Sequence, residues 1–314
     1  MQKYIGLRLL TALPVLLGIS MLAFVLGVIS PGDPAEIALN QNGLDMPTAE
    51  QIAAMREELG LNRSLIVQYC DWLGGVLQGN LGVSYINGKD ILQELTIRLP
   101  VTIKLAVLSL LLAGIGGIGL GIACALRQDG WLDNLLQNIS NILLSIPGFW
   151  LALVFILIFS ERLRILPTSG SESWLHFVMP SLVLASSTMA LVCRFVRGVM
   201  LNEFNKQYFV TAKVRGLSQY KLVMVYALPN AIVPVLAMLG NYFASVLGGS
   251  VIIENIFAIP GISSMAIEAI RFRDYPVLQA YVLLSGWILV VVTVAVDIFI
   301  AYINPKVRLG AKNA

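Results

Sequence analysis

The chain has 314 residues, of which 57% are hydrophobic and 12% are charged, and its mean hydropathy is +0.81. Soluble domains carry about 25% charged residues, so this composition excludes a water-soluble protein and predicts an integral membrane protein. The net charge of +3 is small and does not indicate nucleic-acid binding. One histidine and three cysteines without CxxC spacing argue against a metal site. Cys124 and Cys193 fall in apolar runs and are expected to be buried thiols.

Six apolar runs are long enough to cross a bilayer, which takes about 20 residues. The first covers residues 4–30. Lys3 and Arg8 precede its core, as in a signal peptide, but the run is too long for one and no cleavage site follows, so we expect a retained span. The predicted fold is an all-α integral membrane protein with six transmembrane helices. The other runs lie at about 100–126, 134–160, 177–200, 229–253 and 280–303.

The distribution of charge indicates the orientation of these spans. Residues 31–99 carry nine carboxylates against four basic residues, whereas the short loops on the other side are rich in Lys and Arg. Under the positive-inside rule, both termini are therefore cytoplasmic. We expect a first transmembrane helix over 1–30 and an extracytoplasmic helical loop over 31–99. A five-helix core over 100–303 would include a cytoplasmic segment over 201–228, and a cytoplasmic tail would cover 304–314.

The loop over 31–99 is patterned as a small helical subdomain. Thr48 and Gln51 have the spacing of a capping box, and apolar residues then recur at helical spacing up to Gly60. Ser64 is placed to cap a second helix. The subdomain is either a platform for an external delivery protein or a simple cap that packs against the ends of the spans.

Several residues inside the spans suggest how the helices pack. Gly117 and Gly121 form a GxxxG pair, which lets transmembrane helices approach closely. Pro147 and Pro180 are expected to kink or begin helices. Asp297 is the one carboxylate in the last run, and its place near the cytoplasmic end favours pairing with a basic residue over proton coupling.

The stretch Tyr208–Pro234 is amphipathic and basic, and it interrupts the apolar runs. We expect short helices with an apolar face to bury. Gly216 is placed to end the first helix and Ser218 to cap a second, and Pro229 marks the entry into the next span. The alternative is an ordinary amphipathic surface helix.

The chain shows no source of energy of its own. The nucleotide cradle GxxxxGK[ST] is absent, and the spans lack the series of Asp, Glu and His that proton-driven carriers usually need. An intramembrane enzyme is disfavoured because GxSxG and HExxH are absent as well. A separate ATPase polypeptide is therefore predicted, with a self-sufficient secondary transporter or channel as the alternative.

The spacing after Tyr208 resembles the cytoplasmic EAA motif of ABC-importer permeases. Ala212 is followed by Gly216 and then by Leu228 and Pro229, although Val and Thr stand where the motif has Glu and Ala. Five longer stretches resemble the dipeptide/oligopeptide/nickel class of these permeases, so the resemblance covers nearly the whole chain. They read ALPVLLGISMLAFVLGVISPGDPA, LGLNRSLIVQYCDWLGGVLQGNLGVSY, LPVTIKLAVLSLLLAGIGGIGLGI, GGSVIIENIFAIPGISSMAIEAIRFRDYPVLQ and VDIFIAYINPKVR.

The resemblance implies a type I ABC importer in the bacterial cytoplasmic (inner) membrane. Its partners would be a second homologous permease, two cytoplasmic ATPases that bind ATP and Mg, and an extracytoplasmic solute-binding protein, with no cofactor, metal or nucleic acid held by this chain. The residues implied in coupling to the ATPase are Tyr208, Ala212, Gly216, Leu228 and Pro229.

The segment between the last two spans contains polar residues that are candidates for an outer gate or a contact with the binding protein. They are Glu254, Asn255, Arg273 and Asp274; the alternative is a re-entrant loop shaped by its prolines. The sequence IIENIFA-x-PG resembles nickel members of the class most, but peptide, glutathione and opine members have close variants of it. With few soft ligands in the chain, nickel would pass as a chelate.

Overall fold

The computed structural model describes residues 2–29, 32–41 and 46–303, so the predicted tail over 304–314 lies outside the described residues. Within that part of the chain, helices form the regular structure, and β pairing is limited to one isolated bridge between Val83 and Asp90. The predicted all-α fold is confirmed. The α-helices are α1 (Gln2–Ile29), α2 (Pro34–Gln41), α3 (Ala49–Glu58), α4 (Leu65–Leu77), α5 (Ile91–Leu111), α6 (Gly117–Leu126), α7 (Trp131–Ser145), α8 (Gly148–Phe155), α9 (Val178–Phe204), α10 (Gln207–Val214), α11 (Gln219–Lys221), α12 (Leu228–Gly249), α13 (Val251–Ile256), α14 (Ile262–Phe272) and α15 (Tyr275–Ile303). Three stretches are π-helical, Leu112–Gly116, Ile156–Arg162 and Leu222–Ala227, and Trp174–Phe177 is a 3₁₀ turn.

Four helical stretches are long and apolar enough to cross a membrane. Two further pairs of helices pass the same test when each pair is taken together, but each pair is bent by more than 40°. The described residues therefore hold four candidate spans, or six if each bent pair crosses as one span, which is the number predicted. The four straight candidates are Ile5–Ile29, Ile91–Leu126, Trp174–Phe204 and Tyr275–Tyr302.

The predicted span at 134–160 is broken and not straight. An angle of 106° separates Trp131–Ser145 from Gly148–Arg162. Ile146 between them is extended, with φ −83° and ψ 127°, because Pro147 disfavours a helical backbone in the residue before it. The sequence predicts that Pro147 kinks or begins a helix, and in the structure it separates α7 from α8.

The other predicted spans coincide with helices whose ends are shifted. The helix α9 continues to Phe204, α12 ends at Gly249 and α15 begins at Tyr275. The helix α5 begins at Ile91, so the predicted boundary between 99 and 100 falls inside it. Helical hydrogen bonding continues past the apolar run, because it depends on backbone pairing and not on a lipid environment.

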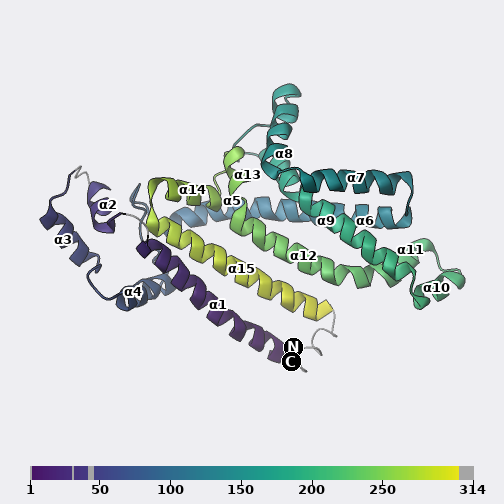
Figure 1. The fold of residues 1–314 in the computed structure, drawn as a ribbon, viewed down its shortest axis with the longest axis horizontal. Coiled ribbons are helices and arrows are strands. Elements are labelled where there is room, and N and C mark those ends of the chain that lie inside the picture. Colours follow the sequence, from purple (N-terminus) through teal and green to yellow (C-terminus); the bar gives the residue numbers. More distant parts are fainter. Residues whose placement is uncertain (1, 30–31, 42–45, 304–314) are drawn as a thin grey trace. The chain divides into compact units, whose positions relative to one another are not determined.

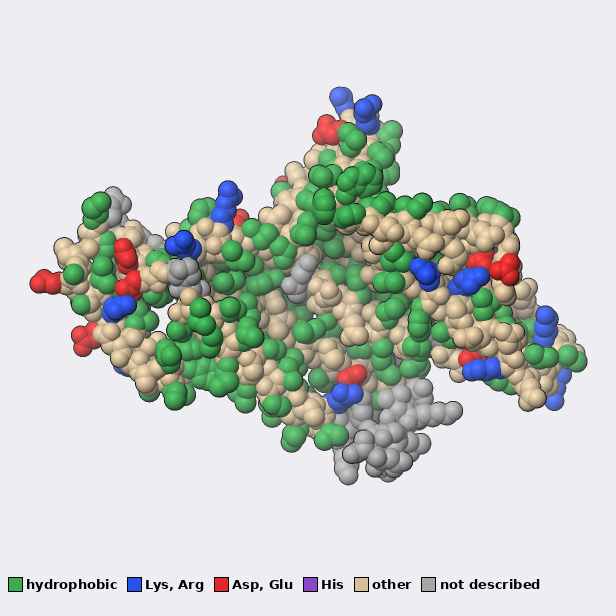
Figure 2. Space-filling view, in the orientation of Figure 1, with side chains coloured by type: hydrophobic (Ala, Val, Ile, Leu, Met, Phe, Trp, Pro, Cys, Tyr) green, Lys and Arg blue, Asp and Glu red, His purple; other side chains and the backbone are tan. Residues whose placement is uncertain are grey.

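The chain divides into two compact units, each described here by itself. The first comprises Met1–Leu9, Ile103–Ile259 and Val291–Ala314, and the second comprises Leu10–Thr102 and Pro260–Val290. In the first unit, α6, α7, α8 and α12 pack against the long helix α9 (Figure 1). Figure 2 shows hydrophobic side chains along the long helices and charged side chains gathered over α2–α3 and over α10–α11.

Glycines let α6 pack closely against α9, as predicted. A Cβ atom on Gly121 would lie 2.7 Å from the carbonyl oxygen of Cys193 and 2.7 Å from Cβ of Val196, and one on Gly117 would also clash with α9. The thiols of Cys124 and Cys193 are buried and free, with their sulfur atoms 4.0 Å apart. This helix pair therefore has no room for a larger side chain at either glycine.

Asp297 pairs with a basic residue, as predicted, and that residue is Arg8. One guanidinium nitrogen of Arg8 lies 3.2 Å from a carboxylate oxygen of Asp297. The pairing supports the structural role that was favoured over proton coupling.

The predicted helices of the segment 31–99 are present. Thr48 Oγ1 accepts a hydrogen bond from the Gln51 backbone, and the Gln51 side chain accepts one from the Thr48 backbone at 2.8 Å, which completes the capping box. Gly60 follows α3 with a φ of +68°. Ser64 stands at the N-cap of α4, but its side chain makes no capping hydrogen bond.

Candidate functional site: the coupling segment and the external cavity

The helix α10 ends as its sequence predicts. Gly216 has a φ of +76°, its N–H donates to the carbonyl oxygen of Lys213 at 3.0 Å, and the N–H of Leu217 donates to that of Ala212 at 3.4 Å. These two bonds form a Schellman motif, which needs a left-handed residue after the helix. Glycine adopts that conformation without a steric penalty.

Ser218 begins the next helix, also as predicted. Its Oγ accepts a hydrogen bond from the backbone N–H of Lys221 at 3.4 Å. Helix α11 then continues through the π-helical stretch into α12. The chain is therefore helical from α11 into α12, without a loop after Ser218.

The predicted entry into the next span is a bend within a helical stretch. An angle of 56° separates Gln219–Asn230 from Ile232–Leu247. Pro229 lies in the first turn of α12 with an exposed side chain, and Leu228 before it is half-buried. Proline in a first helical turn removes an N–H that has no partner within α12 itself.

A polar network around Glu203 connects the coupling segment, residues 201–228, to the helices on both sides of it. The buried Glu203 carboxylate accepts hydrogen bonds from Lys206 Nζ at 2.6 Å, from Asn230 Nδ2 at 3.3 Å and from the Tyr208 hydroxyl. The Asn230 amide also donates to Tyr208 Oη and to the carbonyl oxygen of Tyr226, each at 3.0 Å. The network therefore joins the end of α9, the start of α10 and the start of α12.

Tyr208 is a hydrogen-bond donor in this network. Partial burial, followed by the adjacent Glu203 carboxylate, raises the pKa of Tyr208 to about 12. Its ring also stacks on that of Tyr226, with 6.4 Å between the centroids. The hydroxyl therefore keeps its proton at physiological pH and donates a hydrogen bond to the carboxylate.

The inner face of α10 packs into the core of the first unit. Phe209 and Ala212 are buried in one cluster with Leu222 and Val223 of the returning chain. The ring of Phe209 lies 4.8 Å from that of Phe204. Ala212 thus faces the protein's own core, so a small side chain there lets α10 lie close to the chain that returns to α12.

The outer face of the coupling segment is apolar and basic. Val214 is 82% exposed and Tyr220 is 74% exposed, while Val210 is about half exposed. The side chains of three basic residues are exposed beside them, Lys213, Arg215 and Lys221. An apolar surface with a basic rim is suited to a protein partner that offers apolar and acidic groups.

Two of the predicted gate residues lie in the first unit. Glu254 is fully buried, and its carboxylate accepts a hydrogen bond from Ser250 Oγ at 2.7 Å. Asn255 is exposed and donates from its amide to the carbonyl oxygen of Val251 at 2.9 Å. Only the second of these side chains is at the surface of the unit.

The other two predicted gate residues lie in the second unit. Asp274 is buried and accepts hydrogen bonds from Ser84 Oγ at 2.5 Å and from the Tyr85 backbone at 3.0 Å. Arg273 is exposed and ends α14 in a left-handed conformation, with a φ of +60°. Asp274 therefore fixes the loop around Ser84 to the corner between α14 and α15.

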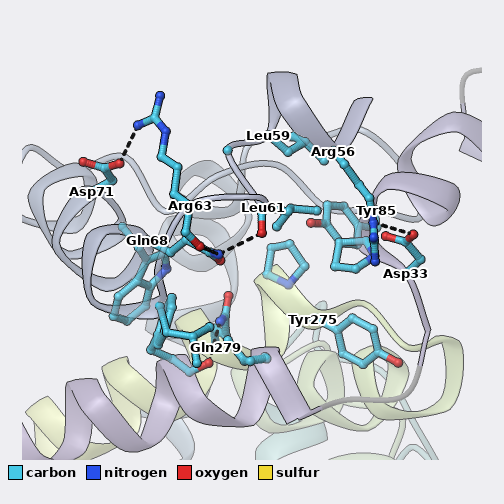
Figure 3. A pocket seen from close by; sticks show the side chains of 18 of the residues that line it. Asp33, Arg56, Leu59, Leu61, Arg63, Gln68, Asp71, Tyr85, Tyr275 and Gln279 are labelled. Atoms are coloured by element: carbon cyan, nitrogen blue, oxygen red, sulfur yellow. Dashed lines mark hydrogen bonds and ion pairs between the residues drawn. The ribbon is translucent and has the colours of Figure 1, made fainter. Parts of the chain in front are cut away.

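The second unit contains a cavity of about 740 Å³. Figure 3 shows that charged and amide side chains reach it from several segments. Arg56 pairs with Asp33, and Arg63 with Asp71, each at 2.9 Å. This volume falls within the range of small-molecule sites, roughly 300–1,000 Å³. The aromatic residues that line it are Phe24, Trp72, Tyr85 and Tyr275.

Hydrogen bonds and burial hold part of the cavity lining. The Gln68 amide donates to the carbonyl oxygens of Leu61 and Arg63, at 3.0 and 2.8 Å. Burial, followed by the charge of Asp274, raises the pKa of Tyr85, which keeps its hydroxyl neutral. The cavity thus offers neutral hydroxyls, amides and both signs of charge.

Comparison with known proteins decides the family. The profile described as "Binding-protein-dependent transport system inner membrane component" matches residues 117–309, and the corresponding N-terminal profile matches residues 1–106. The chain belongs to this family. It is therefore the permease component of a binding-protein-dependent ABC importer, a multi-pass inner-membrane protein that works with ATPase and binding-protein partners. The permease is not itself an ATPase. Membership of this family argues against the alternative hypothesis of a self-sufficient secondary transporter or channel.

Several curated relatives align with the permease over almost its whole length. The glutathione transport system permease protein GsiC of Pectobacterium atrosepticum is 35% identical, that of Salmonella typhimurium 34% and that of Escherichia coli strain K12 33%. Each alignment covers 98% of this chain and 99% of the relative. These relatives support a member of the peptide class and do not specifically support nickel.

A solved structure shares the fold. The structure titled "Inward facing conformations of the MetNI methionine ABC transporter" matches with a TM-score of 0.56 at 15% identity, covering 67% of this chain and 96% of that chain. This likeness concerns the helical architecture alone.

Sequence reasoning missed two members of the polar network, Glu203 and Asn230. One signal was present, because Glu203 is the single carboxylate between Glu172 and Glu254. A lone acid beside a basic segment is a candidate for a buried pair. The amide at Asn230 gives no comparable signal, since it lies at the start of an apolar run.

Proposed function

We propose that the permease carries glutathione or a similar short peptide, and not nickel. The observation that supports this substrate class is the near-complete alignment with three permeases named for glutathione transport. The sequence IIENIFA-x-PG in the C-terminal part resembles nickel members most, but close variants of it occur across the class. The full-length relatives therefore outweigh that shorter resemblance.

We propose that the coupling segment docks onto a cytoplasmic ATPase. The exposed Val210 and Val214 with their basic rim would contact the ATPase, and the network around Glu203 would pass its movement to α9 and α12 as a rigid body. In this proposal Tyr208, Gly216 and Pro229 position the segment. Ala212 and Leu228 act from the inside, because Ala212 is buried and Leu228 is half-buried.

We propose that the complete importer contains a second related permease, two ATPases with ATP and Mg, and an extracytoplasmic binding protein, with both termini of this chain in the cytoplasm. On the external side, the exposed Asn255 and Arg273 are suited to contact the binding protein. Glu254 and Asp274 are buried, so a gating role would require them to change partners during transport.

Uptake of radiolabelled glutathione tests the substrate. The permease would be expressed with its neighbouring subunits in bacteria that lack their own glutathione importer. We expect uptake that unlabelled glutathione abolishes, that short peptides reduce and that nickel salts leave unchanged. Uptake of nickel that depends on a chelator, with no glutathione uptake, would overturn the proposal. A partner ATPase with its nucleotide-binding lysine replaced serves as the control for ATP dependence.

A further inference from the structure

Helix α4 carries an apolar stripe on its surface. Ile66 is 76% exposed and Leu77 is 72% exposed, and Cys70 lies between them and is also exposed. Residues spaced by four and seven positions fall on one side of a helix. We call these three residues the α4 stripe. Such a surface is costly to leave in water, at roughly 25 cal/mol per Å² of apolar area.

The neighbouring side of α4 packs on the span α1. The Tyr69 hydroxyl lies 2.7 Å from Ser20 Oγ. The rings of Tyr69 and Trp72 lie 5.5 and 5.9 Å from the ring of Phe24. Ser20 and Phe24 belong to α1, so these contacts fix the height at which α4 meets the span.

That height lies within the apolar layer. Residues 9–29 of α1 carry no charged side chain, and at 1.5 Å per residue they extend about 31 Å, close to the 30 Å thickness of a hydrocarbon core. Ser20 and Phe24 precede the last residue of α1 by about 13 and 7 Å on the same scale. The contact between α4 and α1 therefore lies within the span and not beyond its Ile29 end.

The third side of α4 is polar. Gln68 and Asp71 lie on this side, and both line the cavity of the second unit. Asp71 pairs with Arg63, and both side chains are well exposed. The apolar half of α4 thus comprises the α4 stripe and the contact with α1, whose Trp72 and Phe24 also border the cavity, and the polar half is turned to the cavity.

We infer that α4 is an interfacial helix. The α4 stripe lies among the acyl chains of the leaflet that surrounds the Ile29 end of α1, and the polar side is turned to water. An amphipathic helix in this position inserts its apolar face about 5–10 Å into the boundary of headgroups and acyl chains, which agrees with the height of Phe24. Lipid is the occupant because the stripe adjoins the apolar surface of α1, where Met21 is 56% and Val25 is 46% exposed beside Ser20 and Phe24. This inference needs the membrane span but not the proposed substrate.

Spin labelling of Cys70 tests it without a substitution. The other two cysteines of this chain are buried, so when the partner subunits carry no accessible cysteine a nitroxide reports from the α4 stripe. In the complete importer, purified from native membranes into lipid nanodiscs, we expect the label to be reached several-fold more by oxygen, which partitions into lipid, than by a water-soluble nickel chelate. A matched pair, Ile66→Cys and Asp71→Cys in a Cys70→Ser background, should show lipid access at position 66 and water access at position 71.

Two results would overturn the inference. Equal access of the nickel chelate to positions 66, 70 and 71 would place α4 in water. Protection of positions 66 and 70 from both probes would mean that another protein subunit covers the α4 stripe. The native Cys70 needs no substitution, and the exposed ion pair that Asp71→Cys removes contributes little to stability, so misfolding does not explain either result.

Discussion

The coupling segment and the α3–α4 segment contain the same local signals for the start and end of their helices. In each, a helix ends before a glycine with positive φ, which is +76° at Gly216 and +68° at Gly60. In each, the next helix begins after a serine, Ser218 or Ser64. The signals that begin and end helices are therefore independent of what holds the helices in place.

The two segments differ in what holds them. The helix α10 buries Phe209 and is joined through Tyr208 to the buried Glu203. Neither α3 nor α4 buries any residue completely, and α4 is held mainly by aromatic contacts with α1. A buried charge with several partners allows few alternative arrangements, whereas α3 and α4, which bury no residue completely, are held by fewer constraints. The proposed coupling role thus falls on the more rigid of the two segments, and the α3–α4 segment is the more adaptable one.

The substitution Glu203→Ala should have the largest effect. It removes the shared acceptor of Tyr208, Asn230 and Lys206 and leaves a cavity, at a cost of about 3 kcal/mol since hydrogen bonds to buried charges contribute about 1.5–3 kcal/mol. We expect a lower unfolding temperature of the purified importer. We also expect ATP hydrolysis that substrate-loaded binding protein no longer stimulates.

Glu203→Gln is the matched control, because it keeps the shape and one acceptor oxygen. It should recover most of the stability and part of the stimulated hydrolysis. Full coupling in the alanine variant would show that the network is not what joins the coupling segment to the spans.

The pair Gly216→Leu and Gly60→Leu compares equal backbone strain at the two segments. A residue with a Cβ in the left-handed region costs about 1–2 kcal/mol, and neither glycine has a close neighbour that would add a clash. We expect Gly216→Leu to separate ATP hydrolysis from glutathione uptake, while Gly60→Leu keeps both. Gly216→Asn should restore uptake, because asparagine tolerates this conformation. Normal uptake by Gly216→Leu would count strongly against a coupling role.

Local features of the structure could be predicted from the sequence because each depends on residues a few positions apart. The capping box at Thr48 and the end of α10 at Gly216 are of this kind. The close packing at Gly121 involves the distant helix α9, but its sequence signal, a glycine four residues after Gly117, is local as well. The pairing of Asp297 with a basic residue was also predictable, since a carboxylate in an apolar run needs a partner.

Features that depend on distant residues could not be predicted. Asn230 lies 27 positions from the Glu203 carboxylate that it contacts, and no periodicity links them. The side of α10 on which Ala212 lies is decided by packing against the returning chain. The sharpness of the turn at Pro147 and the height at which α4 meets α1 likewise follow from tertiary contacts.

The substitution Thr48→Ala should have the smallest effect and should test the adaptable side of the comparison. It removes the Oγ1 acceptor of the capping box, which costs about 1 kcal/mol in the stability of a helix. Since α3 buries no residue completely, that loss should appear as faster amide hydrogen exchange confined to residues 49–58. We expect unchanged uptake and unchanged unfolding of α10. Thr48→Ser keeps the acceptor and should leave exchange at the original rate. If exchange in α10 also accelerated, the two segments would share one cooperative unit, and their separation into a rigid and an adaptable part would fail.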